Sequence, residues 1–281
     1  MPVSSVSREL ALVIERVEAQ ARRDHYARAT PEDRAALGIR TCELDGALVL
    51  AVDRDESLLL NRVLGLGLAT PVTDRALDEI LAHYTARPAE QGPPTGFAIN
   101  LSPFAAPAGI ERSLERRGFR TFFHHLKWVR EDSPAPEART ELRIECVPAA
   151  GATAWTEVSA RVHASSPAHV AWDRRTVGQS GWSHYVAYDG AEGVAVGALF
   201  VHDGAAWLGG AATLEAHRGR GAQGALLARR IRDAIQQGAR RLTLETAPAW
   251  PHLPGESLRN AARAGFYPAY QRPSWIWPVP S

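Results

Sequence analysis

The segment 217–231, HRGRGAQGALLARRI, brings three glycines and two arginines together just before an apolar run. Residues 222–237 predict a helix, because apolar side chains recur at helical spacing. Its apolar face comprises Leu227, Ile231, Ala234 and Ile235, whereas Arg229, Arg230, Arg232 and Asp233 fall mostly off that face. The glycines therefore lie at a helix N-terminus, where backbone N–H groups lack intrahelical partners and the helix dipole adds positive charge. We expect this turn to bind an anion such as a phosphate.

The elements on either side of the glycine turn predict a strand, loop, helix, strand unit. Residues 206–213, AWLGGAAT, form a strand-like run before the turn. Residues 241–246, RLTLET, alternate as a strand does, and Gly238 stands in the position of a helix C-cap.

Composition favours two globular domains in a reducing compartment. The chain has 281 residues, 45% of them hydrophobic, and a net charge of +1, so neither a nucleic-acid partner nor a membrane is indicated. Cys42 and Cys146 lie far apart, and no histidine or cysteine spacing predicts a metal.

Charges interrupt the apolar positions of residues 1–26, which predicts an amphipathic helix and no signal peptide. We expect a cytoplasmic protein, and the oligomeric state stays open.

An internal repeat divides the chain. Residues 114–129 align with residues 261–276 at one constant offset, as the pairs Gly118 and Gly265, Phe119 and Phe266, Phe123 and Tyr270, and Trp128 and Trp275 show. Segments that precede residues 114–129 in the first copy also resemble segments that precede residues 261–276 in the second copy, in the same order. We therefore expect a first domain over residues 1–131, a charged, proline-bearing linker over 132–140 and a second domain over 141–281.

The two copies differ at the glycine turn. The first copy has residues 68–84, LATPVTDRALDEILAHY, in the place of that turn, without glycine. Asp74, Asp78 and Glu79 would repel a phosphate there. We expect a single competent anion site, in the second copy.

Two common phosphate-binding motifs fit this sequence poorly. Gly219, Gly221 and Gly224 spell G-x-G-x-x-G, with Glu245 about 20 residues further on, as in the dinucleotide-binding fingerprint. However, Glu215, His217 and Arg218 separate the strand from the first glycine, and little chain remains after Glu245 for more strand and helix units. A Walker loop is not indicated either, because no G-K-[ST] follows.

Residues 218–223, RGRGAQ, resemble motif A of the GNAT superfamily of N-acetyltransferases, whose pattern is Q/R-x-x-G-x-G/A. Residues 257–260, SLRN, and 263–266, RAGF, resemble the element that follows it. The resemblance covers residues 206–270 and, through the repeat, implies an α+β chain of two tandem GNAT-like domains, the first degenerate. Each domain would be a mixed, mostly antiparallel central sheet flanked by helices.

The resemblance also implies acetyl-CoA as co-substrate, with its pyrophosphate on the N–H groups of residues 219–224. The pantetheine would pair with the strand edge at 211–213, and N–H groups at a bulge of Ala212 and Thr213 would polarise the thioester carbonyl. The implied cofactor-binding residues are Ala211, Ala212, Thr213, Arg218, Gly219, Arg220, Gly221, Ala222, Gln223, Gly224 and Asn260.

Two positions depart from the family pattern. Gln223 stands where Gly or Ala is preferred, which costs little if only its backbone N–H is used. Ala261 stands where many members have the tyrosine that protonates the leaving thiolate. Tyr267 and Tyr270 are near in sequence, and Tyr270 is expected in the core.

The implied reaction is acetyl transfer to a small-molecule or peptide amine. Such an amine must lose a proton before it attacks, and Glu245, on the strand after the helix, is the best candidate base, with His184 second. A solvated strand-end glutamate is an equally good interpretation of Glu245. Trp172, Trp182 and Tyr185 could form an aromatic acceptor wall, with core packing as the alternative. The alternative function is that of a non-catalytic acyl-CoA-binding regulatory or scaffolding protein.

Overall fold

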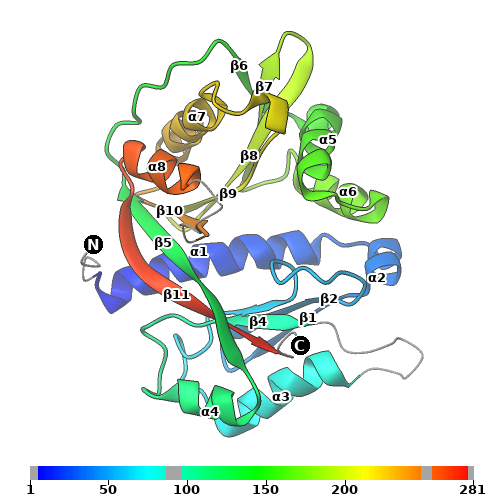
Figure 1. Ribbon diagram of the computed structural model, residues 1–281, viewed down its shortest axis with the longest axis vertical. Helices are drawn as coiled ribbons and strands as arrows, with labels where there is room; N and C mark the ends of the chain where they lie inside the picture. Colours follow the sequence, from blue (N-terminus) through cyan, green and yellow to red (C-terminus); the bar gives the residue numbers. More distant parts are fainter. Residues whose placement is uncertain (1–5, 87–95, 248–254, 278–281) are drawn as a thin grey trace. The chain divides into compact units, whose positions relative to one another are not determined.

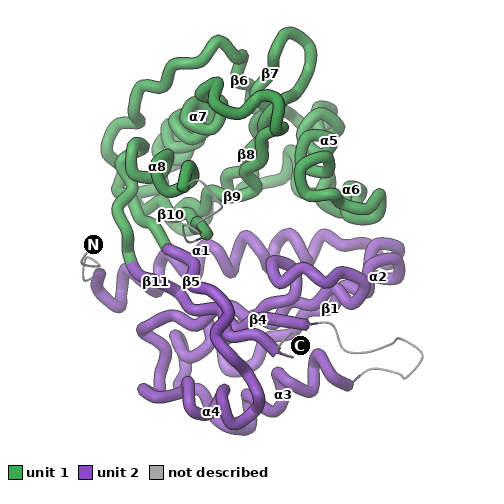
Figure 2. Tube along the Cα trace, in the orientation of Figure 1, with its two compact units in different colours: residues 1–4, 127–269 green, residues 5–126, 270–281 purple. Residues whose placement is uncertain are grey.

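The computed structural model describes residues 6–86, 96–247 and 255–277. Among these, residues 127–269 form one compact unit, called unit 1, and residues 6–126 with 270–277 form another, called unit 2 (Figure 2). None of the helices in these ranges is long and apolar enough to cross a membrane.

Unit 2 is a sheet with helices from the first half of the chain (Figure 1). Its elements are α1 (Arg8–Ala27), α2 (Pro31–Leu37), β1 (Ile39–Leu44), β2 (Ala47–Val52), β3 (Arg62–Leu64), α3 (Asp74–Thr85), β4 (Phe97–Asn100) and α4 (Ile110–Arg116). The strands β1, β2 and β3 pair antiparallel, and β3 pairs parallel with β4. The helix α1 confirms the expected amphipathic helix, whose first five residues lie outside the described ranges.

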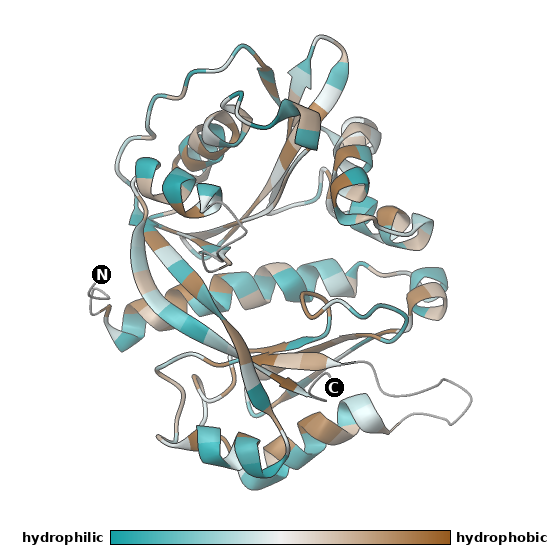
Figure 3. Cartoon of the chain, in the orientation of Figure 1, coloured by the Kyte–Doolittle hydropathy of each residue, from teal (hydrophilic) through white to brown (hydrophobic). Residues whose placement is uncertain are grey.

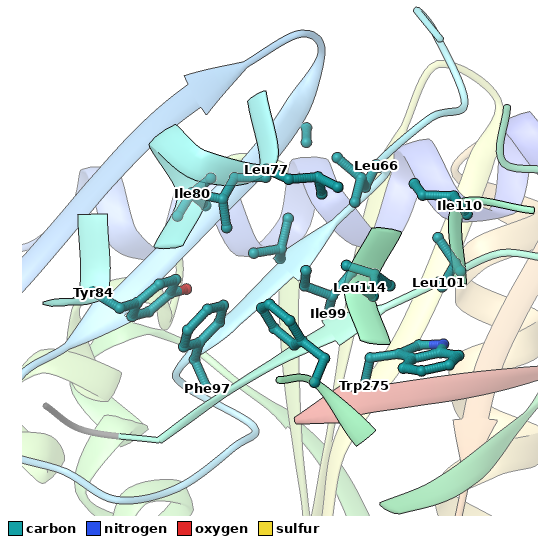
Figure 4. Packing of buried hydrophobic residues seen from close by; sticks show 14 of the residues in the cluster. Leu66, Leu77, Ile80, Tyr84, Phe97, Ile99, Leu101, Ile110, Leu114 and Trp275 are labelled. Atoms are coloured by element: carbon teal, nitrogen blue, oxygen red, sulfur yellow. The ribbon is translucent and has the colours of Figure 1, made fainter. Parts of the chain in front are cut away.

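The core of unit 2 lies between its helices and its sheet. The Tyr84 ring of α3 stacks on Phe97 of β4 with 3.7 Å between ring centroids (Figure 4). The Phe119 ring contacts Phe97 edge-on. The Tyr84 hydroxyl donates to the Leu50 carbonyl at 2.6 Å, so the one polar atom of this stack is satisfied.

Unit 1 repeats the arrangement with longer strands. Its elements are β6 (Arg143–Val147), η2 (Ala149–Gly151), α5 (Ala152–His163), α6 (Pro167–Asp173), η3 (Arg174–Thr176), β7 (Trp182–Asp189), β8 (Glu192–His202), β9 (Ala205–Thr213), η4 (Glu215–His217), α7 (Ala222–Gln236), β10 (Arg241–Thr246) and α8 (Glu256–Arg263). The strands β6 to β9 pair antiparallel in chain order, and β9 pairs parallel with β10. Both hydrophobic and hydrophilic residues occur along α7 (Figure 3).

The internal repeat and the α+β class are confirmed. In each half, antiparallel strands are followed by a parallel pair of strands with a helix between them in the chain. In unit 2 this is β3, α3 and β4, and in unit 1 it is β9, α7 and β10. The following helix, α4 or α8, ends before a glycine with positive φ, +86° at Gly118 and +78° at Gly265. Only glycine adopts this conformation without strain, which explains the G-F pair in both copies. Phe119 and Phe266 are both buried.

The compact units differ from the expected domain boundaries at the last strand of each copy. These strands are β5 (Arg120–Glu131) and β11 (Tyr267–Trp277). The end of β11 pairs antiparallel with β4 in unit 2, where Trp275 joins the core. The end of β5 belongs to unit 1, where the Trp128 indole donates to Thr246 Oγ1 at 2.9 Å. The repeat alone does not determine which strand ladder each final strand joins, because those hydrogen bonds are long-range.

Candidate functional site

A cavity of about 690 Å³ opens in unit 1 where β9 and β10 diverge. The parallel ladder between them runs from the pair Arg241 and Ala205 to the pair Thr243 and Trp207. Beyond it, residues 208–213 of β9 and 244–247 of the β10 side line the cavity, together with α7 and α8. A volume of this size is typical of small-molecule sites.

The N-terminus of α7 is open toward this cavity. Gly221 is the N-cap, with φ +79°, and no side chain caps the helix. A Cβ atom added at Gly219 or Gly224 would meet nothing within 4 Å. The first N–H groups of α7 are therefore available to a ligand, and two glycines leave room for it, as the expected anion site requires.

Gly221 is held more tightly than expected from an exposed loop. A Cβ atom there would lie 2.6 Å from the Arg139 carbonyl oxygen, and its φ is in the left-handed region. A side chain at Gly221 would therefore strain the backbone as well as crowd the ligand.

The two arginines of the glycine turn lie in different surroundings. Arg218 is exposed and lines the cavity, whereas Arg220 does not line it. The Arg220 guanidinium pairs with Asp189, which raises the pKa of Arg220 and lowers the pKa of that carboxyl through their hydrogen bond. Any contact of Arg220 with a ligand would thus involve its backbone.

Gln223 links α7 to the neighbouring strands. Its side-chain amide donates to the Ala212 carbonyl and the Thr213 hydroxyl at 2.9 Å each, and to the Val196 carbonyl at 3.2 Å. The Gln223 side chain is half-buried and hydrogen-bonded to the strand edge, so this position has a structural role besides its backbone N–H.

The irregularity in β9 lies two residues before the expected position. Gly209 pairs with Ala198 and Ala212 pairs with Val196, so Gly210 and Ala211 together oppose one residue of β8. The bulge is therefore at Gly210 and Ala211, and the expectation of a bulge at Ala212 and Thr213 is wrong. Gly210 has φ +57°, a conformation that glycine adopts readily and that fixes the bulge at this position.

The helix α8 closes one side of the cavity. Asn260 lines it, as expected from the resemblance, beside Ser257. Ala261 also lines it and is buried, so the position at which the resemblance implies a tyrosine contributes only a methyl group. Tyr270 is buried in unit 2, where its hydroxyl donates to Glu15 at 2.7 Å, in agreement with the expected core role.

The two candidate bases have different locations. Glu245, on β10, is half-buried and lines the cavity. His184, on β7, is 1% exposed and does not line it; its Nε2 atom is 3.1 Å from Thr176 Oγ1 and its ring packs between Trp155 and Trp182. Of the two, only Glu245 is placed to reach a ligand in this cavity.

The expected aromatic acceptor wall is not at the cavity. Trp172 and Tyr185 are fully buried, and the Tyr185 hydroxyl donates to Asp233 at 2.9 Å. Trp182 packs on Phe200 and Trp207. Trp172 and Tyr185 are thus part of the buried interior and Trp182 packs against the core, so the core-packing alternative holds.

Arg230 is a residue of the site that the sequence did not predict. The sequence pattern puts it mostly off the apolar face of α7, yet it is 3% exposed and lines the cavity. Its guanidinium is accommodated because Gly197 lacks a Cβ atom, which would otherwise lie 2.7 Å from Arg230 Cζ. Gly197 is 33 residues earlier in the sequence, so no pattern near Arg230 signals this burial.

The corresponding helix of unit 2, α3, is closed to anions. The Thr73 side chain caps it by accepting from the Ala76 N–H. Asp74 and Asp78 lie in its first turns and bind Arg117 at 3.0 and 2.7 Å. The hydrogen bond from Arg117 lowers the pKa of Asp78, so this carboxylate is charged at neutral pH and repels a phosphate.

Comparison with known proteins relates part of the second half of the chain to one family. Residues 152–251 match the sequence model of the acetyltransferase (GNAT) family. No curated protein matches the chain.

Solved structures resemble the chain over most of its length. A GCN5-related N-acetyltransferase from Kribbella flavida matches with a TM-score of 0.61 at 17% identity, covering 95% of this chain and 96% of that one. A GCN5-related N-acetyltransferase from Sphaerobacter thermophilus matches with a TM-score of 0.58 at 19% identity, covering 82% and 79%. A tandem GNAT protein from the clavulanic acid biosynthesis pathway matches with a TM-score of 0.54 at 18% identity, covering 78% and 75%. At these identities the likeness concerns the fold, which is the tandem GNAT fold.

Proposed function

We propose that unit 1 binds acetyl-CoA and transfers the acetyl group to the amine of a small molecule or peptide, since residues 152–251 match the sequence model of the acetyltransferase (GNAT) family. The observation that carries this proposal is the uncapped N-terminus of α7, with open space at Gly219 and Gly224, at the mouth of a cavity between two diverging strands. Polarised N–H groups at a helix N-terminus suit the pyrophosphate of CoA.

The residues of the cavity fit the rest of such a co-substrate. Residues 208–213 of β9 lie beyond the β9–β10 ladder, so backbone groups on that edge, other than the Gly209 carbonyl bound by Arg230, are available to the amide-bearing pantetheine arm. The Ala212 carbonyl already accepts from Gln223, which leaves one lone pair of that oxygen for a ligand. Asn260 adds a polar side chain from α8.

In the proposed reaction Glu245 removes the proton from the attacking ammonium, through water or directly. Backbone N–H groups near the β9 bulge polarise the thioester carbonyl. Since Ala261 offers no acid, the thiolate leaves without a proton from that position.

Calorimetric titration with acetyl-CoA tests the binding step. We expect one site per chain, because α3 in unit 2 is capped and carries acids. No binding would contradict the proposal, and a stoichiometry near two would contradict a closed first half.

Thiol release from acetyl-CoA against a panel of small-molecule and peptide amines tests the transfer step. Ala261 is the observation that favours the alternative, a non-catalytic acyl-CoA-binding regulatory or scaffolding protein. Tight binding without turnover on any amine would support that alternative.

A further inference from the structure

The Arg230 guanidinium is a buried cation on the cavity wall. Its Nε atom donates to the Leu226 carbonyl, and its Nη1 atom donates to the carbonyls of Ala198 and Gly209, each at 3.2 Å. Of the five N–H donors of an arginine, these bonds use three, and the two on Nη2 remain.

These partners solvate the charge of Arg230 but do not neutralise it. Within the described ranges, no carboxylate forms an ion pair with it. Burial lowers its pKa to about 10, so it stays protonated at neutral pH. A buried cation with free donors and no counter-ion is suited to an anion that forms in the cavity.

Arg230 lies on the cavity wall beside the end of the ladder between β9 and β10. Gly209, which it binds, comes just after the last ladder residue of β9, Trp207. Along α7 it is eight residues from Ala222, which corresponds to about 12 Å from the phosphate-binding end. A phosphopantetheine arm that starts at that end is long enough in extended form to reach this depth.

The anion that acyl transfer generates there is the CoA thiolate. We infer that the Nη2 edge of Arg230 binds the CoA sulfur and stabilises the leaving thiolate, in the absence of a hydroxyl at Ala261. This inference rests on the proposed function. After Glu245 has taken the first proton of the ammonium, the neutral amine nitrogen bonds to the acyl carbon and the C–S bond breaks with its electron pair on sulfur. The second nitrogen proton goes to solvent water, and Arg230 keeps its protons.

The other ionisable groups on the cavity wall are His217, Arg218, Glu245, Glu256, Arg259 and Arg263. The three other arginines are exposed, so solvent screens their charges, and Arg230 is the only buried cation of the set.

The ionisation of bound CoA tests this inference without a known acceptor. The ultraviolet absorbance of the thiolate is followed against pH in the protein–CoA complex, and the same titration with desulfo-CoA is subtracted to cancel Cys42 and Cys146. We expect the thiol pKa of bound CoA to be at least about one unit below that of free CoA, since nearby arginines lower thiol pKa values. Arg230→Gln should abolish that shift, whereas Arg230→Lys should retain part of it.

Two further variants distinguish the role of the charge from loss of structure. Gly197→Ala keeps the arginine but displaces its guanidinium, so it should also raise the thiol pKa. Arg229→Gln, on the same helix but paired with Asp233 and absent from the cavity wall, should leave it unchanged. The same thiol pKa in parent, Arg230→Gln and Gly197→Ala would overturn this inference while CoA binding stands. Failure to bind CoA at all would instead refute the proposed function.

Discussion

The Gln223 side-chain amide donates to the Ala212 carbonyl at 2.9 Å, which joins the first turn of α7 to the edge of β9. The same nitrogen reaches the Val196 carbonyl and the Thr213 hydroxyl. The phosphate-binding end of the helix and the strand that would hold the pantetheine are thus fixed to each other by one side chain.

Gln223→Ala should lower the free energy of unfolding by about 1 kcal/mol, because buried carbonyls lose a donor. The Kd for acetyl-CoA should not rise, since the backbone N–H of residue 223 and the Ala212 carbonyl stay available. Denaturant unfolding and calorimetry measure the two quantities. Gln237→Ala is the matched control, because its amide makes only an exposed contact of 3.5 Å with Ser183. Equal stability losses in both variants would contradict the linking role of Gln223.

Gly224→Asp should weaken acetyl-CoA binding at least about tenfold without destabilising the fold. Its Cβ atom enters open space, and the carboxylate repels the phosphate at a helix N-terminus. Gly224→Asn, of nearly the same size and uncharged, should bind much more tightly than the aspartate variant. Similar affinities for the two variants would show that bulk and not charge matters. Gly221→Asp is a poorer test, since the Arg139 carbonyl leaves no room for its side chain.

Glu245→Gln should reduce turnover about 10²-fold or more with little change in acetyl-CoA affinity, because glutamine keeps the shape but takes no proton. The pH optimum should move upward, as deprotonated amine becomes the reacting species. Steady-state kinetics with an accepted amine measures both effects. Glu256→Gln, an exposed glutamate on the same cavity wall, is the control. Parental turnover in Glu245→Gln would make Glu245 a bystander.

The stability of the chain should fall as the pH drops from about 6.5 to about 4 through His83. Burial, with help from Arg40, lowers the pKa of His83 to about 4, whereas the unfolded chain has the ordinary value of 6.5. Because the unfolded state binds the proton first, the stability is complete above pH 6.5 and is lost as the pH falls toward 4, at no more than about 1.4 kcal/mol per pH unit.

Denaturant unfolding at pH 7 and pH 5 measures this slope. His83→Gln should flatten it, and His124→Gln, on an exposed side chain, should not. A parental slope in His83→Gln would show that other groups control the acid sensitivity.

The sequence by itself determined the repeat, the glycine turn and the helix after it. These features are local: apolar spacing sets α7, and positive φ at Gly118 and Gly265 requires glycine in each copy. The sequence also predicted that the two helix N-termini differ, because the acids of α3 stand at the positions that correspond to the glycines of α7.

The tertiary structure alone decided where long-range contacts fall. In the structure the end of β11 pairs with β4, and the bulge lies at Gly210 and Ala211. Trp172 and Tyr185 lie in the core and do not line the cavity. It also buried Arg230, whose burial depends on the missing Cβ of a glycine on β8, more than 30 residues earlier. Strand ladders and such pockets join residues that are distant in sequence, so no local pattern specifies them.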